Sequence, residues 1–221
     1  MFDGKFRRSV DATTAPIGRW LVRAGFSADV LTGSGLVFAA LTSWSIAVGM
    51  HFWAIVLLTI TGFHDLFDGP VAKASQRASQ RGSFFDSVVD RIVDALLLGG
   101  VAYYLTAHQH GQLVLLPFAI LTTTFMISYQ RSKAESLGLN AKGGLMERAE
   151  RMILLGFGLL ASPLFIPTLW VMLGLTAMTA LGRFRRVWLS AARPAPVSHV
   201  RESDRPHVRR VRRGLSRAAR H

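Results

Sequence analysis

Six stretches of this sequence are apolar enough to form membrane-spanning helices. They cover residues 29–50, 52–63, 84–107, 113–129, 152–164 and 167–181. A helix needs about 20 mostly apolar residues to cross a bilayer, and a water-soluble domain of 221 residues would not contain several such runs. The fifth run is short, so we expect its helix to begin in the polar stretch near Glu147. The sequence therefore predicts an all-α, polytopic membrane protein with six transmembrane helices.

The connections between these runs fall into two groups by charge. The turns near residues 51, 108–112 and 162–167 contain neither lysine nor arginine. The other connections are basic and carry Lys73, Arg77, Arg81, Arg131, Lys133, Lys142, Arg148, Arg151, Arg183, Arg185 and Arg186. Cytoplasmic loops of membrane proteins are enriched in lysine and arginine. We therefore expect a multi-pass protein of the cell membrane, with both termini and the functional site on the cytoplasmic side.

The formal net charge of +13 has two interpretations. A basic surface can bind nucleic acid. In a membrane protein, basic loops instead hold the cytoplasmic face and contact anionic lipid. Because the basic residues follow the loops, we expect no nucleic-acid partner. The sequence has no cysteine, which excludes disulfides and a thiol nucleophile.

The two ends of the chain differ in composition from the apolar middle. Residues 4–24 alternate basic and apolar side chains, which predicts an interfacial amphipathic helix within residues 1–28. Their charges are spread out, unlike those of a cleaved signal peptide. Residues 191–221 are rich in arginine and proline, which predicts a disordered basic cytoplasmic tail, either bound to anionic head groups or simply solvated. Residues 1–190 form the membrane domain, with the six-helix bundle over residues 29–190.

Four aspartates interrupt the apolar sequence at the end of the second run and the start of the third. Asp65 and Asp68 are three residues apart, and Asp86 and Asp90 are four apart, so each pair shares one face of a helix. The basic loop between the two runs folds the third helix back beside the second, which lets the pairs converge.

Converging carboxylates repel one another and must be neutralised. Arg91 alone cannot do this, whereas an all-oxygen ligand set suits Mg²⁺ or Mn²⁺. The alternative is a network of salt bridges that also includes Arg91 and Asp94. Carboxylates in membrane helices usually mark functional sites, which favours the metal. Asp94 lies one turn further along, and it is interpreted either as an acid that supports the site from behind its ligands or as a structural acid.

The acids belong to a longer pattern with fixed spacing. The run Asp65-x2-Asp68-Gly69-x2-Ala72-Lys73-x8-Gly82-x3-Asp86-x3-Asp90 resembles the signature of the CDP-alcohol phosphatidyltransferases. Lys73 stands where that family has arginine, which keeps the charge but loses the bidentate fork. Pro70, inside a helical stretch, is expected to kink the second helix.

This resemblance implies a six-helix homodimer in which two Mg²⁺ or Mn²⁺ ions hold the diphosphate of CDP-diacylglycerol. It assigns metal ligation to Asp65, Asp68, Asp86 and Asp90, and it makes Asp90 the general base that takes the proton of the acceptor hydroxyl. It assigns nucleotide binding to Asp29, Gly69, Lys73 and Gly82.

A second polar stretch follows the fourth run, at residues 127–151. Its basic residues, together with Arg183, either form an anion pocket beside the acids or only set the membrane topology. The Ile127–Leu139 and Glu147–Arg151 segments resemble the actinobacterial phosphatidylinositol phosphate synthases within the same family. That likeness implies that the acceptor phosphate is held by Ser128, Arg131, Lys133, Arg151 and Arg183.

The function expected from the sequence is transfer of a phosphatidyl group from CDP-diacylglycerol to a phosphate-bearing alcohol, with release of CMP. Inositol phosphate is the favoured acceptor. Glycerol 3-phosphate is the alternative, because both acceptors carry a phosphate. A membrane protein that only binds or carries cations is the alternative from another class.

Overall fold

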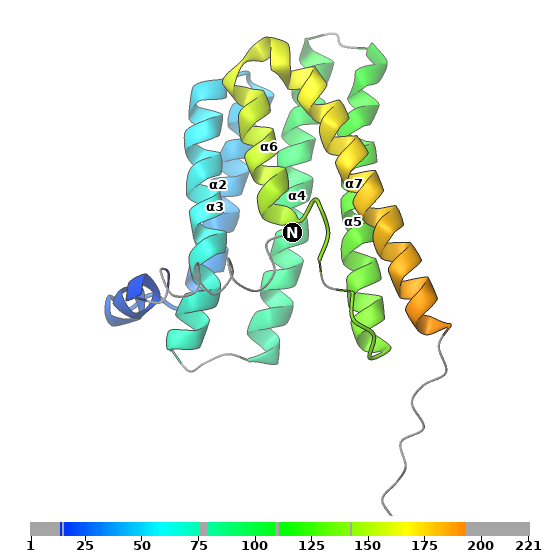
Figure 1. Cartoon of the computed structure of the whole chain (residues 1–221). Coiled ribbons are helices and arrows are strands. Elements are labelled where there is room, and N and C mark those ends of the chain that lie inside the picture. The colour runs from blue at the N-terminus through cyan, green and yellow to red at the C-terminus, as the bar shows by residue number, and fades with distance from the viewer. Residues whose placement is uncertain (1–13, 15, 76–78, 109–110, 142, 193–221) are drawn as a thin grey trace, which may run out of the picture.

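The computed structural model describes residues 14, 16–75, 79–108, 111–141 and 143–192 (Figure 1). Within these ranges the protein is all-helical and contains no strand. The helices are α2 (Ala28–Ala47), α3 (His51–Ala74), α4 (Gln80–Ala107), the 3-10 helix η1 (Gly111–Val114), α5 (Leu115–Ser136), α6 (Arg148–Leu160) and α7 (Ser162–Ala191). The expected all-α class is confirmed. The tail at 193–221 lies outside the described residues.

Within the described part of the chain, four helical segments are long and apolar enough to cross a membrane. They are α2, α3, the η1–α5 segment and α7. The other two long elements fall short for physical reasons: α4 carries Asp86, Asp90, Arg91 and Asp94, and α6 has only 13 residues. The six apolar runs therefore correspond to observed helices, while the full count of six spans stays a prediction.

The boundary between α6 and α7 differs from the expected one. The fifth run was expected to extend to residue 164, but α6 ends at Leu160 because Ala161 is extended (φ −142°, ψ 118°). The next helix begins at Ser162, with Pro163 in its first turn, where a missing N–H costs little. Pro167 therefore lies inside α7 rather than at its start. The start of α6 at Arg148 confirms the expectation of a helix beginning near Glu147.

The N-terminal segment packs against the bundle at one close contact. Residues 16–23 are helical, and Ser27 caps α2 by accepting a hydrogen bond from the Val30 N–H at 3.2 Å. A Cβ at Gly18 would lie 2.9 Å from the Pro70 carbonyl carbon, so glycine is required for this approach. Pro70 lies inside α3, at the place where the N-terminal helix meets it. The predicted interfacial role of residues 1–28 stays a prediction.

The bundle consists of two groups of three helices. In the first, α2 packs on both α3 and α4; in the second, α7 packs on both α5 and α6. Small residues permit the close crossings: a Cβ at Gly100 would collide with the Ser43 carbonyl oxygen, and the Ser43 hydroxyl donates to the Leu96 carbonyl at 2.6 Å. The groups meet where α3 packs on α6 and α4 packs on α5.

The connections alternate between the two ends of the bundle (Figure 1). The α2–α3, α4–α5 and α6–α7 turns lie at one end, whereas the α3–α4 and α5–α6 loops and the end of α7 lie at the other. Among the described residues, the four aspartates of the motif and the arginines Arg131, Arg148 and Arg183 belong to the second end or to the helix turns leading to it. The fold therefore gathers the charged segments at one end of the bundle.

Candidate functional site

The four aspartates of the motif converge on one small cavity. Asp65 and Asp68 project from α3, Asp86 and Asp90 from α4, and all four line a space of about 20 Å³. A cavity of that size has room for about one water-sized particle. The two pairs of aspartates therefore lie together, as their spacing on the two helices predicted.

The donor chemistry of this cavity fits a divalent cation. Carboxyl groups that face one small cavity repel one another unless a proton or a cation lies between them. Mg²⁺ and Mn²⁺ prefer such oxygen ligands. As the side chains stand, the described residues contain no group of three or more acids and histidines drawn together as closely as metal ligands.

An arginine from α6 reaches into the acidic cluster. The Arg148 guanidinium donates to Asp65 Oδ1 at 2.8 Å and also forms an ion pair with Asp90. Its side chain is only 14% exposed. Arg148 therefore supplies positive charge to the aspartates. This pairing was not predicted from the sequence, where only Arg91 was considered as their counter-charge. The place of Arg148 three residues before Arg151 on the same helix was the available signal.

A second cavity, of about 460 Å³, opens on the other side of Asp68 and Asp86. It is lined by the α2 start at Asp29 and by both motif glycines, Gly69 and Gly82. A Cβ at Gly69 would meet nothing within 4 Å, so a side chain there would project into open space. The Ser79 hydroxyl caps α4 by accepting from the Gly82 N–H at 3.0 Å, which fixes this wall. Of the four residues expected to bind nucleotide, these three are brought together.

Lys73 lies within α3, one turn beyond Gly69. Its side chain is outside the described part of the structure. The expected contact between Lys73 and the nucleotide therefore stays a prediction.

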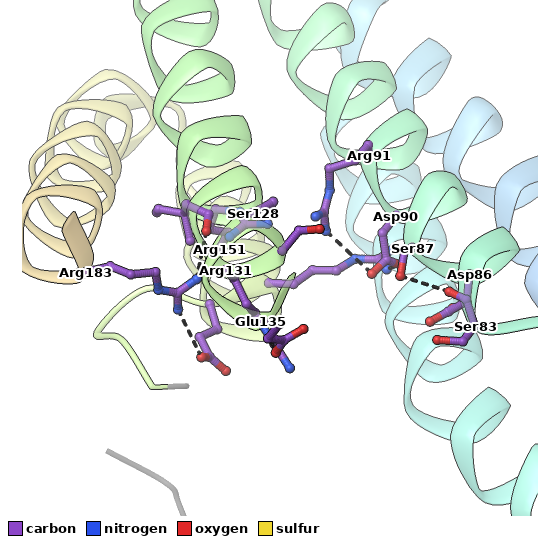
Figure 2. Close-up of a pocket in the computed structure, with 14 residues that line it drawn as sticks. Ser83, Asp86, Ser87, Asp90, Arg91, Ser128, Arg131, Glu135, Arg151 and Arg183 are labelled. Carbon is purple, nitrogen blue, oxygen red and sulfur yellow. Dashed lines mark hydrogen bonds and ion pairs between the residues drawn. The ribbon is translucent and has the colours of Figure 1, made fainter. Parts of the chain in front are cut away.

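A third cavity, of about 620 Å³, lies between α4, α5, α6 and α7 (Figure 2). Its charged walls carry Arg91, Arg131, Arg148, Arg151, Arg183, Asp86, Asp90, Glu135 and Glu147. Its hydroxyl groups come from Ser83, Ser87, Ser128 and Ser132. A concave site with several guanidinium groups suits an anion bearing a phosphate. Most of the basic residues singled out in this region therefore line one cavity, and their binding of an acceptor phosphate stays a prediction.

The five residues expected to hold the acceptor phosphate are not placed alike. Ser128, Arg131, Arg151 and Arg183 line this cavity. Lys133 is exposed and is not among the lining residues. Lys133 and Arg131 are two residues apart on α5, a spacing that turns the two side chains to different faces.

Arg183 also has a structural task. Its guanidinium donates to the Ile127 carbonyl at 2.8 Å and to the Gly143 carbonyl at 3.2 Å, and it pairs with Glu147 at 3.6 Å. Gly143 has a φ of 84°, which favours glycine, and its carbonyl also accepts from Arg186 at 2.8 Å. Arg183 thereby holds the loop that precedes α6 against α5 and α7.

A fourth, apolar cavity of about 770 Å³ runs between α3 and α6. Its walls include Leu58, Phe63, Met152 and Phe157, and it ends beside Asp65. The sequence analysis did not identify it, because its lining residues look like ordinary membrane-helix residues.

Asp86 lies where three of these spaces meet. It lines the acidic cavity, the cavity at the motif glycines and the basic cavity. The acidic centre therefore has a glycine-lined compartment on one side and an arginine-lined compartment on the other.

The fold and these compartments define a helical membrane protein with an acidic centre between two polar cavities. A model of the CDP-alcohol phosphatidyltransferase family matches residues 26–188. The chain belongs to this family.

Curated relatives and solved structures agree with that family. The chain is 27% identical to the phosphatidylinositol phosphate synthase of Mycolicibacterium smegmatis over 203 residues, which cover 87% of this chain and 91% of that protein. It is 36% identical to the archaetidylinositol phosphate synthase of Methanothermobacter thermautotrophicus over 167 residues, 75% of this chain and 82% of that protein.

The structure resembles crystal structures of Mycobacterium tuberculosis phosphatidylinositol phosphate synthase. One has CDP-DAG bound and aligns with a TM-score of 0.74 at 26% identity, covering 83% of this chain and 98% of that one. Another, in complex with manganese and citrate, gives the same TM-score and covers 93% of that chain.

Proposed function

We propose that this protein is an integral membrane phosphatidyltransferase that moves the phosphatidyl group of CDP-diacylglycerol to a hydroxyl of inositol phosphate and releases CMP. The observation that carries this proposal is the position of Asp86 at the junction of three cavities. A group transfer between two substrates needs this arrangement, since donor and acceptor must meet at one reactive centre. The names of the relatives favour inositol phosphate as the acceptor.

Each compartment receives one part of the substrates. The nucleotide of the donor lies against Asp29, Gly69, Lys73 and Gly82, and its acyl chains follow the apolar cavity between α3 and α6. The phosphate of the acceptor lies among Ser128, Arg131, Arg151 and Arg183. Lys133 contributes charge at the rim.

The reaction is a displacement at the phosphorus that carries diacylglycerol. The acceptor hydroxyl oxygen forms a bond to this phosphorus, and the bond from the phosphorus to the CMP oxygen breaks. Asp90, which lines both the acidic and the basic cavity, takes the hydroxyl proton. CMP leaves with the bonding electron pair.

Asp65, Asp68, Asp86 and Asp90 would hold the divalent cations, for which we propose two Mg²⁺ or Mn²⁺ ions. When bound, such ions neutralise charge on the phosphoryl oxygens and on the leaving group. A related structure that contains manganese supports this proposal.

The membrane arrangement follows from the charges. We propose six spans, α2 to α7, with both termini and the charged end of the bundle on the cytoplasmic side. α4 crosses despite its charges because they end at Asp94 and the half of the helix that follows carries none. We expect a homodimer, as the family resemblance implies.

The test is acceptor-dependent release of CMP. Purified protein with CDP-diacylglycerol and Mg²⁺ should release CMP when inositol phosphate is added. If CMP is released with glycerol 3-phosphate but not with inositol phosphate, glycerol 3-phosphate is the acceptor. If no acceptor leads to CMP release, the protein is not this enzyme, and a protein that only binds cations is favoured.

A further inference from the structure

Asp94 is a buried carboxylate that the reaction described above does not use. It lies on α4 one turn beyond Asp90, is 5% exposed, and lines none of the four cavities. A buried carboxylate is costly unless it is paired and hydrogen-bonded. Its partners therefore show what it is held for.

Both partners of Asp94 belong to the basic cavity. Arg151 of α6, itself 5% exposed, donates to Asp94 Oδ2 at 2.8 Å. Arg91, one turn back on α4, lies 3.8 Å from the same oxygen. Both arginines line the cavity that we assign to the acceptor.

The ion pair joins two helices whose backbones are not in contact. Among the described helices, α6 packs on α3 and α7, and the backbones of α4 and α6 do not pack together. Long side chains span the gap, namely Arg151 to Asp94 and Arg148 to Asp90. The direction of the Arg151 guanidinium is thus set from the opposite helix.

We propose that Asp94 is a positioning residue for the acceptor: it fixes the guanidinium group of Arg151 at the wall of the basic cavity. A guanidinium has five donors in a rigid fork, so one carboxylate can orient it and leave other donors for a phosphate. The inference rests on the proposed function and deepens its acceptor half. Asp94 touches no substrate and acts through Arg151.

The experiment compares two Michaelis constants in the full-length protein. Asp94→Asn keeps the size of the side chain and removes its charge. It should raise the KM for inositol phosphate about tenfold, because Arg151 loses its charged partner, and leave the KM for CDP-diacylglycerol within about twofold. An unchanged acceptor KM in folded Asp94→Asn would overturn the inference.

A double-mutant cycle separates positioning from simple stabilisation. In an Arg151→Ala background, which itself has a raised acceptor KM, Asp94→Asn should add less than about a twofold change. Full additivity of the two effects contradicts the proposal. If Asp94→Asn does not fold, Asp94→Glu keeps the charge but shifts it by one methylene. It should raise the acceptor KM about threefold without affecting the donor KM, and equal changes in both would overturn the inference.

Thr176→Val is the matched structural control. It removes the hydrogen bond from Thr123 to Thr176, 3.0 Å long, between α5 and α7 and away from the cavities. It should lower the Tm but leave the acceptor KM unchanged. If Asp94→Asn behaves like this control, its role is structural and the inference fails. A wild-type protein that releases no CMP with any acceptor removes the proposed function as well, so the two failures are distinguishable.

Discussion

The two three-helix groups of this bundle have the same plan and opposite chemistry. In each, one helix packs on two others that do not pack on each other: α2 on α3 and α4, and α7 on α5 and α6. The first group presents Asp65, Asp68, Asp86 and Asp90. The second presents Arg131, Arg148, Arg151 and Arg183. The basic cavity needs both groups, because Arg131, Arg148, Arg151 and Arg183 come from the second and Asp86 and Asp90 from the first.

This difference shows how an acidic centre is tolerated in an apolar bundle. Arg148 and Arg151 reach from α6 to Asp65, Asp90 and Asp94 on the first group. Uncompensated carboxylates in this environment would be strongly unfavourable. The seam between the groups is therefore held by charge near the site and by apolar packing, around Leu97, Ile120, Leu155 and Leu169, deeper in the bundle.

The largest expected effect tests the acidic group. Asp90→Asn removes the proposed base and should lower the turnover about 10²- to 10⁴-fold, because asparagine cannot take the hydroxyl proton. The measurement is CMP release at saturating substrates, with the Tm as a control for folding. Near-normal turnover would show that Asp90 is not the base.

The next effect tests the basic group. Arg183→Lys should raise the acceptor KM about tenfold and lower stability by about 1–2 kcal/mol, because lysine cannot bind both carbonyls that Arg183 contacts. Arg186→Lys is the matched control, since Arg186 is exposed and shares the Gly143 carbonyl. Equal effects of the two substitutions would contradict the assignment of Arg183 to the acceptor.

A thermal measurement tests the seam itself. Arg148→Gln should lower the Tm of the protein in EDTA by about 4–8 °C, corresponding to about 2 kcal/mol, because Asp65 and Asp90 lose their counter-charge. Added Mg²⁺ should then raise the Tm more than it does in the wild type. Arg131→Gln, which breaks an exposed pair with Glu135 3.0 Å long, should change the Tm little. The larger Mg²⁺ response is expected because Arg148 and the cation compete for Asp65 and Asp90. A response equal to that of the wild type would contradict this competition.

A smaller effect concerns the motif position where this chain departs from the family. Lys73→Arg should preserve the turnover or lower the KM for CDP-diacylglycerol about two- to threefold, because arginine adds a bidentate contact to phosphate. The measurement is the KM for the donor at fixed inositol phosphate. A clear loss of activity would show that the nucleotide side has adapted to lysine.

The smallest effect is expected outside the bundle. Deletion of residues 195–221 should leave the turnover in detergent nearly unchanged, because every residue named above as lining a cavity precedes this segment. The same assay in vesicles of anionic lipid tests whether the tail binds head groups. A loss of turnover in detergent would assign it a part in the reaction.

Much of the fold follows from local periodicity. The apolar runs marked all six long helices, since a helix in lipid must be apolar over most of its length. The predicted end of α6 was wrong, because apolar residues continue through Ala161 into α7. The helix ends there through an extended backbone conformation at Ala161, which hydropathy does not reveal. The acidic centre was also predictable, because spacings of three and four residues place side chains on one helical face.

The sequence by itself therefore determined the helices, the convergence of Asp65, Asp68, Asp86 and Asp90, and the family. Only the tertiary structure decided that Arg148 pairs with Asp65 and Asp90 and that Asp94 holds Arg151. The physical reason is distance along the chain. Positions on one helix are fixed by its own geometry, whereas contacts between α6 and the acidic helices depend on how whole helices pack.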